Sequence, residues 1–347
     1  MEKEKKLLNT LKGKRYDIPP VWMMRQAGRY MPQYRKIREK YDFMTMCKTP
    51  EIACEITLQP IDEFGMDGAI LFSDILTVPE AMGMKLEFLE GKGPVFESPL
   101  RTREDIEKLN IEGIGERLSY VFDAVKLIRM SLDEDKTLIG FAGAPITLAA
   151  YMVEGSSSRN YVYLKSLMYN DTRSFNLMME KLVNALIVYY GGQVENGAEV
   201  LMLFDTFAGI FSPADYKRYI FPFVKKLAEA LKKNHPETPL IYFPKGAGGF
   251  YTLLTELNVD GIGIDWFSSL TDADQKLEGK FVLQGNLDPV VLFADYQVIE
   301  RETKRVLEEG RKLKKGHIFN LGHGILPQTP VDSVKKMLEV IRARNFS

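Results

Sequence analysis

The chain has 347 residues, of which 45% are hydrophobic and 27% are charged, and its formal net charge is −1. This composition is typical of a globular protein, and no apolar run approaches the ~20 residues of a membrane helix. The start, Met-Glu-Lys-Glu-Lys-Lys, leads into Leu-Leu-Asn without the apolar region of a signal peptide. We therefore expect a protein that neither spans a membrane nor binds one.

The two cysteines, Cys47 and Cys54, bear on the compartment. Seven residues apart on one helix, their side chains would lie about 10 Å apart, which is too far for a disulfide. They form no Cys-x-x-Cys pair and belong to no His/Cys cluster, so no zinc site is expected. Two buried free thiols fit a reducing compartment, and we expect a cytoplasmic protein.

Positive charge is concentrated near the amino terminus. Residues 1–40 contain 12 Lys and Arg against 4 Asp and Glu. A basic segment can bind nucleic acid, but zinc-finger spacing, an RRM-type aromatic motif and a long basic run are all missing from the sequence. We therefore expect no nucleic-acid partner.

Residues 1–19 predict a helical or frayed amino-terminal extension, and the first apolar run, Val21–Met24, follows it. This run leads into a loop that carries Arg25 and Arg29 with Gly28 between them. Arginine matches planar carboxylates with paired N–H donors. A cluster just past a strand end predicts a pocket for a polyanion, although a solvated basic face would give the same pattern.

Short apolar runs recur along the whole chain, each bounded by turn residues. They are Val21–Met24, Ala69–Phe72, Thr137–Ala142, Val200–Phe204, Leu240–Phe243, Gly261–Ile264, Phe281–Leu283 and Ile318–Leu321. Continuous apolar runs are typical of parallel strands buried on both faces. Eight such units, each with room for a helix, predict an α/β fold: a single (β/α)8 TIM barrel with residues 1–347 as one domain. The alternative is a doubly wound open sheet, but no Gly-x-Gly-x-x-Gly follows the first run.

Turn and cap signals add local detail. Residues 85–97, after the second run, predict a hairpin that turns at residues 91–93. Ser212-Pro213, Thr329-Pro330 and Thr49-Pro50 each predict a helix start, with the hydroxyl residue as N-cap and proline in the first turn.

A barrel carries its active site on the loops that follow the carboxyl ends of its strands. In this sequence those loops hold polar side chains, whereas the runs are apolar. The candidates are Arg25, Arg29, Asp74, Tyr151, Asp205, Thr206, Lys245, Asp265, Asp288 and His323. Of the three histidines, only His323 falls at this face, and glycines flank it. The asymmetry predicts a polar catalytic mouth.

Several of these residues also have a purely structural interpretation. Asp74 is placed to cap the following turn. Asp205 and Asp265 could pair with nearby basic groups, and Asp288 could be a turn residue. Lys245-Gly-Ala-Gly-Gly249 has the glycines of a phosphate loop but lacks the Walker spacing.

Longer motifs resemble a known family. These are Trp22-Met-Met-Arg-Gln-Ala-Gly-Arg-Tyr-Met-Pro32, Phe72-Ser-Asp-Ile-Leu76, Gly143-Ala-Pro-Ile-Thr-Leu148, Tyr151-Met-Val-Glu154, Phe204-Asp-Thr-Phe-Ala-Gly209 and Asn320-Leu-Gly-His-Gly324. All of them resemble signatures of the uroporphyrinogen decarboxylases, they keep the family's order, and the match runs from about residue 19 to about residue 330. The first motif is long and highly specific.

The resemblance implies a (β/α)8 barrel that forms a homodimer with the two clefts facing each other. It implies conversion of uroporphyrinogen III to coproporphyrinogen III, by loss of CO2 from four acetate side chains, in porphyrin and haem biosynthesis. No metal or organic cofactor is expected. By position, the family's substrate-binding residues fall on Arg25, Gln26, Ala27, Gly28, Arg29, Arg38, Asp74, Tyr151, Thr206 and His323.

The expected catalytic group is Asp74, Arg25, Arg29, Tyr151 and His323. The arginines have obvious partners in the carboxylates of a tetrapyrrole. A pyrrole protonated on carbon can take up the electrons that CO2 leaves behind, and a carboxylate at position 74 would stabilise that cation. Because the substrate supplies its own electron sink, no pyridoxal-type cofactor is required. The general acid stays open between an arginine-held water, Asp74 and His323.

Two other functions remain as alternatives. A corrinoid-dependent methyltransferase of the same fold family would need a zinc thiolate site, and no cysteine lies near His323 in the sequence. A non-catalytic tetrapyrrole-binding protein would keep the arginines, but it would not need a carboxylate that faces the pyrroles.

Overall fold

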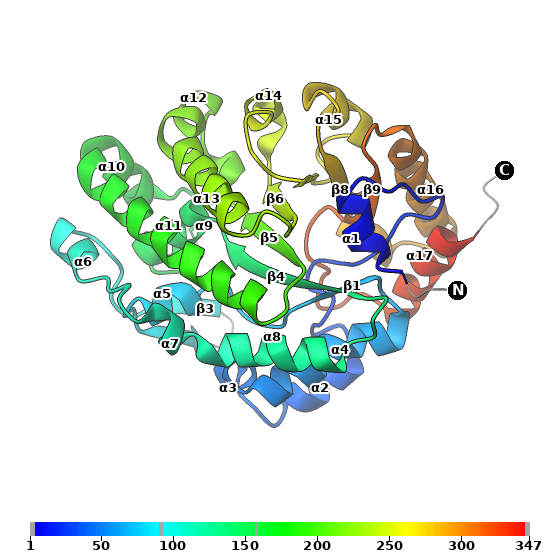
Figure 1. The fold of residues 1–347 in the computed structure, drawn as a ribbon, viewed down its shortest axis with the longest axis horizontal. Helices are drawn as coiled ribbons and strands as arrows, with labels where there is room; N and C mark the ends of the chain where they lie inside the picture. Colours follow the sequence, from blue (N-terminus) through cyan, green and yellow to red (C-terminus); the bar gives the residue numbers. More distant parts are fainter. Residues whose placement is uncertain (1–3, 90–92, 157, 344–347) are drawn as a thin grey trace.

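The computed structural model describes residues 4–89, 93–156 and 158–343. Its centre is a curled parallel sheet of seven strands in the order β1-β4-β5-β6-β7-β8-β9 (Figure 1). The strands are β1 (Gly68–Ile70), β4 (Thr137–Gly143), β5 (Val200–Asp205), β6 (Leu240–Pro244), β7 (Gly261–Gly263), β8 (Val282–Leu287) and β9 (His317–Leu321). Seven of the eight predicted runs therefore form strands, and helices cover the outer face of the sheet, as continuous apolar strands require.

The first run, Val21–Met24, is not a strand. Val21 makes an isolated parallel bridge to Phe319 of β9, and on its other side its carbonyl accepts the N–H of Asp67, next to β1. The N–H groups of Met23 and Met24 then donate to the side chains of Gln26 and Asn320 instead of to a neighbouring strand. The described residues thus contain seven strands of the predicted eight-stranded barrel, with Pro20–Trp22 lying between the two sheet edges.

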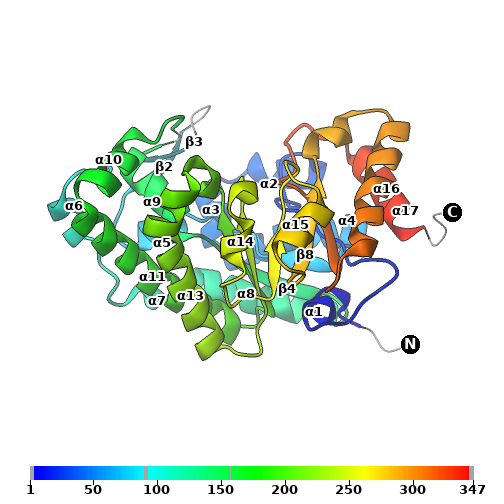
Figure 2. The same ribbon diagram turned by 90° about the horizontal axis from the view of Figure 1, so that it is seen from above.

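Helix α1 (Lys6–Leu11), within the predicted extension, covers the amino ends of the strands. Leu7 packs against Gly68 at the start of β1, and Leu11 packs against Gly261 at the start of β7. Figure 2 shows α1 on the side away from α2 (Pro32–Arg38) and the β2–β3 pair. One end of the curl is therefore closed by apolar side chains, and a polar site is expected at the other end.

The remaining helices surround the sheet or extend its loops. The longer ones are α4 (Pro50–Phe64), α8 (Ser119–Ser131), α9 (Pro145–Glu154), α10 (Val162–Asn170), α11 (Thr172–Glu195), α13 (Phe221–Asn234), α16 (Tyr296–Lys312) and α17 (Val331–Arg342). The shorter ones are α3 (Phe43–Lys48), α5 (Thr77–Ala81), α6 (Arg103–Glu107), α7 (Ile114–Arg117), α12 (Pro213–Asp215), α14 (Tyr251–Leu254) and α15 (Leu270–Lys276). Four further turns are η1 (Ala208–Ile210), the π-helical η2 (Tyr216–Ile220), η3 (Ala247–Gly249) and η4 (Pro289–Phe293).

The inside of the curl is a packed core and not a pore. Trp22 is fully buried there, and its Nε1 donates to Oε1 of Gln284 on β8 at 2.8 Å. Nε2 of Gln284 lies 3.9 Å from the sulfur of Met202 on β5. The first apolar run is thereby tied to strands on both sides of the interior.

The local predictions have mixed outcomes. β2 (Leu86–Leu89) pairs antiparallel with β3 (Gly93–Phe96), as the predicted hairpin requires, but residues 91 and 92 of the predicted turn lie outside the described residues. Ser212 caps α12 as predicted, through a hydrogen bond from the Asp215 N–H. The Thr329 cap is wrong, because α17 begins one residue later than predicted and Pro330 is its N-cap residue.

The cysteines are free and buried, as predicted. They lie on different helices, Cys47 on α3 and Cys54 on α4, because the extended backbone of Thr49 separates the two. In the part of the chain that the structure describes, no helix is long and apolar enough to cross a membrane.

Candidate active site

Arg25 stands at the carboxyl end of the Pro20–Trp22 segment, in an unusual backbone conformation. Its φ of 63° is left-handed, which costs a non-glycine residue about 1 kcal/mol or more and is typical of functional sites. Its exposed side chain runs along Gly324, where a Cβ atom would lie 2.4 Å from Cδ of Arg25. The glycine after His323 therefore provides the space that the guanidinium stem occupies.

Gln26 is fully buried and points away from the solvent that Arg25 meets. Its Oε1 accepts the Met23 N–H at 3.0 Å, and its Nε2 donates to the carbonyl of Gly68 at 2.9 Å. Both ends of the amide are bonded to backbone, and the predicted contact between Gln26 and a substrate stays a prediction. Gln26 instead fastens the arginine loop to the start of β1.

Arg29 is exposed, and the backbone of its loop is held by the side chain of Arg35. Arg35 donates to the carbonyls of Arg29 and Tyr30 at 2.9 and 3.0 Å, so its guanidinium braces the backbone. Arg38, also exposed, donates to the carbonyl of Tyr41 at 2.7 Å. Among the described residues, no carboxylate forms an ion pair with Arg25 or with any of these three arginines. Within the described residues, this cluster of four arginines therefore has no carboxylate counter-ion.

Asp74 follows β1 and is half-buried. Its Oδ1 accepts the N–H of Leu76 at 2.8 Å, so the turn-cap interpretation is confirmed for that oxygen. Its Oδ2 has no hydrogen-bond partner within the described ranges. Burial raises the pKa of Asp74 to about 6, against the lowering effects of the Leu76 N–H and the positive charge of Arg25.

Tyr151 and Thr206 supply hydroxyls from the segments that follow β4 and β5. Tyr151 projects from α9, its ring lies 5.5 Å from that of Phe207, and it is half-buried. Burial and the negative charge of Asp74 raise the pKa of Tyr151, while Arg25 lowers it. Thr206, directly after β5, is half-buried, and its hydroxyl has no hydrogen-bond partner among the described residues. Ala27 and Gly28 are half-buried in the arginine loop.

His323 follows β9 and is half-buried. Its ring centroid lies 6.2 Å from that of Phe243 and 6.4 Å from that of Trp266. Burial, with the positive charges of Arg25 and Lys245, lowers the pKa of His323 to about 3. The imidazole is therefore neutral at physiological pH. One of its ring nitrogens can donate a hydrogen bond and the other can accept one.

Asp205 and Asp265 pair with no basic group in the described ranges, so that interpretation is wrong there. Asp205 is fully buried and accepts hydrogen bonds from the hydroxyls of Tyr242 at 2.6 Å and Thr147 at 3.1 Å. Asp265 accepts the N–H groups of Gly246 and Phe267. Both aspartates hold loops at the mouth in place. Asp288 is a turn residue as predicted, since its Oδ1 accepts the Val290 N–H.

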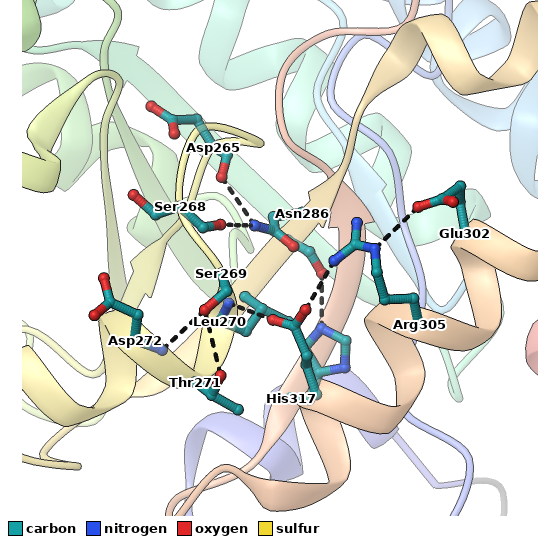
Figure 3. A network of polar contacts seen from close by, with 12 residues as sticks. Asp265, Ser268, Ser269, Leu270, Thr271, Asp272, Asn286, Glu302, Arg305 and His317 are labelled. Carbon is teal, nitrogen blue, oxygen red and sulfur yellow. Dashed lines mark hydrogen bonds and ion pairs between the residues drawn. The ribbon is translucent and has the colours of Figure 1, made fainter.

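A polar network behind the mouth joins β7, β8 and β9 to their helices (Figure 3). Nδ2 of Asn286 donates to the carbonyls of Asp265 at 2.9 Å and Ser268 at 2.6 Å. Nε2 of His317 lies 2.7 Å from the carbonyl of Gly285, and burial lowers the pKa of this histidine to about 4. The network fixes the loop that carries Trp266, and no sequence signal identified it, because its partners are backbone carbonyls.

Four of the five predicted catalytic residues, Arg25, Asp74, Tyr151 and His323, lie near one another, and Arg29 is in the same loop as Arg25. The charge of Arg25 acts on Asp74, Tyr151 and His323, which come from three separate loops. The described residues contain no group of three or more His, Cys, Asp or Glu side chains placed to hold a metal ion. Unpaired cations beside a half-buried acid, at the carboxyl ends of parallel strands, define an α/β enzyme that acts on an anionic substrate.

Comparison with known proteins gives the particular family. The family model described as uroporphyrinogen decarboxylase (URO-D) matches residues 2–344, and the chain belongs to this family. A uroporphyrinogen decarboxylase of Legionella pneumophila (strain Corby) is 44% identical over 335 residues, 96% of this chain and 95% of the relative. One from Geobacter metallireducens is 46% identical over 336 residues, 97% of each chain.

Solved structures support the fold alone. A methyltransferase from Methanosarcina mazei superposes with a TM-score of 0.79 at 21% identity, covering 98% of both chains. A B12-independent methionine synthase from Shewanella gives a TM-score of 0.54 at 10% identity, over 84% of this chain and 87% of its own. At these identities the likeness shows a shared α/β architecture and nothing about the reaction.

Proposed function

We propose that this chain binds uroporphyrinogen III at the mouth of its curled sheet and removes CO2 from the four acetate side chains, giving coproporphyrinogen III. The protein is a carboxy-lyase, a uroporphyrinogen decarboxylase of porphyrin and haem biosynthesis. The observation that carries the proposal at the level of residues is the arginine cluster without counter-ions beside Asp74.

The arginines account for binding. The substrate carries one carboxylate on every side chain, and Arg25 and Arg29 present exposed guanidinium groups that no protein carboxylate neutralises. Each can accept a carboxylate through two parallel N–H donors. Arg38 extends the cationic surface along α2, and its existing bond to the Tyr41 carbonyl leaves further donors free.

Each decarboxylation replaces a carboxylate by a hydrogen. The C–C bond to the carboxylate breaks, CO2 leaves, and the methylene carbon finally takes a proton and becomes a methyl group. The proton that was added to the ring carbon is then released and the pyrrole is restored, so each step consumes one proton overall. The electron pair needs an acceptor in between, and a pyrrole ring protonated on carbon provides one. Oδ2 of Asp74, which is free of protein partners, faces the pyrrole N–H groups in this proposal and stabilises the cation.

Asp74 must be ionised for that role. With a pKa of about 6 it carries its charge at neutral pH, and it loses that charge as the pH falls through 6. Its low solvent exposure strengthens the interaction with a cation, since fewer water molecules screen it.

His323 enters as a neutral hydrogen-bonding group. Its pKa of about 3 in the free protein argues against a proton stored on this ring. Because Asp74 is ionised in this proposal, the proton for the pyrrole then comes from a water held by an arginine. The hydroxyls of Tyr151 and Thr206 orient the substrate through hydrogen bonds, and Ala27 and Gly28 let the macrocycle approach the backbone. Gln26 acts as a positioning residue.

The finer architecture is part of the proposal. Pro20–Trp22 takes the place of the eighth strand in a closed (β/α)8 barrel. This is supported by its hydrogen bonds to β9 on one side and to Asp67 on the other. Residues 1–347 form one domain, with residues 1–19 as its extension.

A second copy faces the mouth in a homodimer, which sedimentation velocity would detect. Two buried free thiols support a cytoplasmic location.

Incubation with uroporphyrinogen, followed by separation of products by carboxylate number, tests the function. We expect stepwise loss of carboxylates, ending at coproporphyrinogen, with one CO2 released per step. Tight binding of uroporphyrinogen without release of CO2 would contradict the proposal and favour a tetrapyrrole-binding protein. Transfer of a methyl group from a methylated corrinoid, in place of decarboxylation, would favour a methyltransferase.

A further inference from the structure

Lys245 has an environment that the roles above do not explain. It follows β6, is half-buried, and forms no ion pair with any carboxylate in the described part of the chain. Its Nζ lies 5.5 Å from the centroid of the Trp266 ring. A contact of this kind contributes about 0.5–1 kcal/mol at a partly exposed site. That is little compensation for a half-buried charge without a counter-ion.

The backbone around Lys245 is held on every side. Its N–H donates to the carbonyl of Asp205 at 3.0 Å, and its own carbonyl accepts the N–H of Gly209 at 2.9 Å. The next N–H, that of Gly246, donates to the carboxylate of Asp265. These hydrogen bonds fix the backbone from which the Lys245 side chain projects over Trp266.

The same contacts exclude two other interpretations. In the described part of the chain Asp265 forms no ion pair with Lys245; its two carboxylate oxygens accept the N–H groups of Gly246 and Phe267. The glycine-rich loop from Lys245 to Gly249 does not form a phosphate cradle, because a protein carboxylate already occupies the Gly246 N–H. The ammonium group itself remains available to an anion from outside.

The strand order places Lys245 across the mouth from the arginine loop. β6 is separated from the Pro20–Trp22 segment by β7, β8 and β9 in one direction and by β5, β4 and β1 in the other. The side chains nevertheless approach one residue. Nζ of Lys245 lies 5.5 Å from the centroid of the Trp266 ring, whose centroid is 6.4 Å from that of His323, and the stem of Arg25 runs along Gly324, next to His323. Both positive charges accordingly lower the pKa of His323. Cationic groups therefore stand on two opposite sides of one site, with His323 between them.

We propose that Lys245 is a further substrate-binding residue, whose ammonium group pairs with a carboxylate on the edge of the tetrapyrrole opposite to the edge held by Arg25 and Arg29. This inference rests on the proposed function, because it uses the distribution of carboxylates around a macrocycle. A ring with acidic side chains along its whole periphery cannot be held flat by cations on one side alone. Lysine suits the position as a compact point charge that follows the carboxylate while the ring is reoriented.

The test uses steady-state kinetics of the full-length protein with uroporphyrinogen as the probe. Lys245→Met keeps the length of the side chain and removes its charge, and Lys245→Arg keeps the charge. Lys233→Met is the matched control, because Lys233 is an exposed lysine near the end of α13, on the side that leads to the amino end of β6.

We expect Lys245→Met to raise KM on the order of 10–100-fold, the value of a lost hydrogen bond to a charged group, and to change kcat much less. Lys245→Arg should recover most of that loss, and Lys233→Met should match the wild type. A KM for Lys245→Met within twofold of the wild type would overturn the inference. A fall in kcat with unchanged KM would also overturn it, in favour of proton donation.

A second readout does not depend on turnover. NMR titration of the His323 ring, assigned with a His323→Asn variant, should show a higher pKa in Lys245→Met than in the wild type, since one nearby positive charge is gone. An unchanged pKa would mean that Lys245 points elsewhere, and it would overturn the inference. If the wild type itself leaves uroporphyrinogen unchanged, the proposed function fails. If the wild type is active and Lys245→Met is equally active, only the role of Lys245 fails.

Discussion

Replacement of Gln26 by leucine should loosen the arginine loop and destabilise the protein. The side chain is fully buried, and its amide makes two hydrogen bonds, to the Met23 N–H at 3.0 Å and to the Gly68 carbonyl at 2.9 Å. Leucine fits a similar volume but can satisfy neither group. Each buried polar group left without a partner costs about 1–3 kcal/mol. Since leucine regains part of this through its apolar surface, we expect a loss of about 2–4 kcal/mol in the free energy of unfolding.

Urea unfolding followed by circular dichroism measures this loss directly. Gln33→Leu is the matched control, because Gln33 is exposed on α2 and its side chain donates to the half-buried Glu63 side chain. The control should change stability by less than about 0.5 kcal/mol. Gln26→Leu should also lower kcat/KM at temperatures where it is folded, because Arg25 is no longer fixed. A stability equal to that of the control would refute the anchoring role.

Three further predictions concern the mouth. Arg25→Ala and Arg29→Ala should each lower kcat/KM by a factor that corresponds to about 2–4 kcal/mol of transition-state binding. The control Arg103→Ala removes an exposed helical ion pair with Glu107 and should leave the kinetics unchanged. Wild-type kinetics in both Arg25→Ala and Arg29→Ala would mean that the substrate carboxylates bind elsewhere. Activity should rise with pH through about 6 as Asp74 ionises, and a rate that stays flat from pH 5 to 7.5 would contradict this assignment. Gly324→Ala should weaken substrate binding with little loss of stability, because the new Cβ displaces the flexible stem of Arg25, and an unchanged KM would show that this contact has no role in binding.

Much of the sheet could be predicted from the sequence, because strands buried on both faces are continuously apolar. The exception, Val21–Met24, is equally apolar but forms only one bridge. The N–H groups of Met23 and Met24 donate to the side chains of Gln26 and Asn320, which are 3 and 296 residues away along the chain. Here side chains replace a neighbouring strand as hydrogen-bond acceptors. Such contacts depend on the assembled fold, and the periodicity of apolar residues does not predict them.

The positions of Arg25, Asp74 and His323 followed from one rule, that loops after parallel strands meet at a common end. What the rule could not give was the orientation of each side chain. Gln26 lies in the same loop as Arg25 but turns inward. Asp205 follows β5 but is buried against Tyr242. Both outcomes depend on partners that are distant in sequence. The place of a residue in a motif therefore predicts the region of the fold where it lies, but it does not predict the contacts of its side chain.

The most direct test of the account is the single-turnover rate of CO2 release by Asp74→Asn with uroporphyrinogen bound. Asparagine keeps the shape of the side chain, removes the charge, and presents an N–H donor where the pyrroles need an acceptor. Because the charge acts mainly on the protonated ring, we expect the rate to fall by ~10²–10³, with a much smaller change in substrate binding. Release of CO2 at nearly the wild-type rate would contradict the account and leave Asp74 as the cap of the Leu76 turn alone.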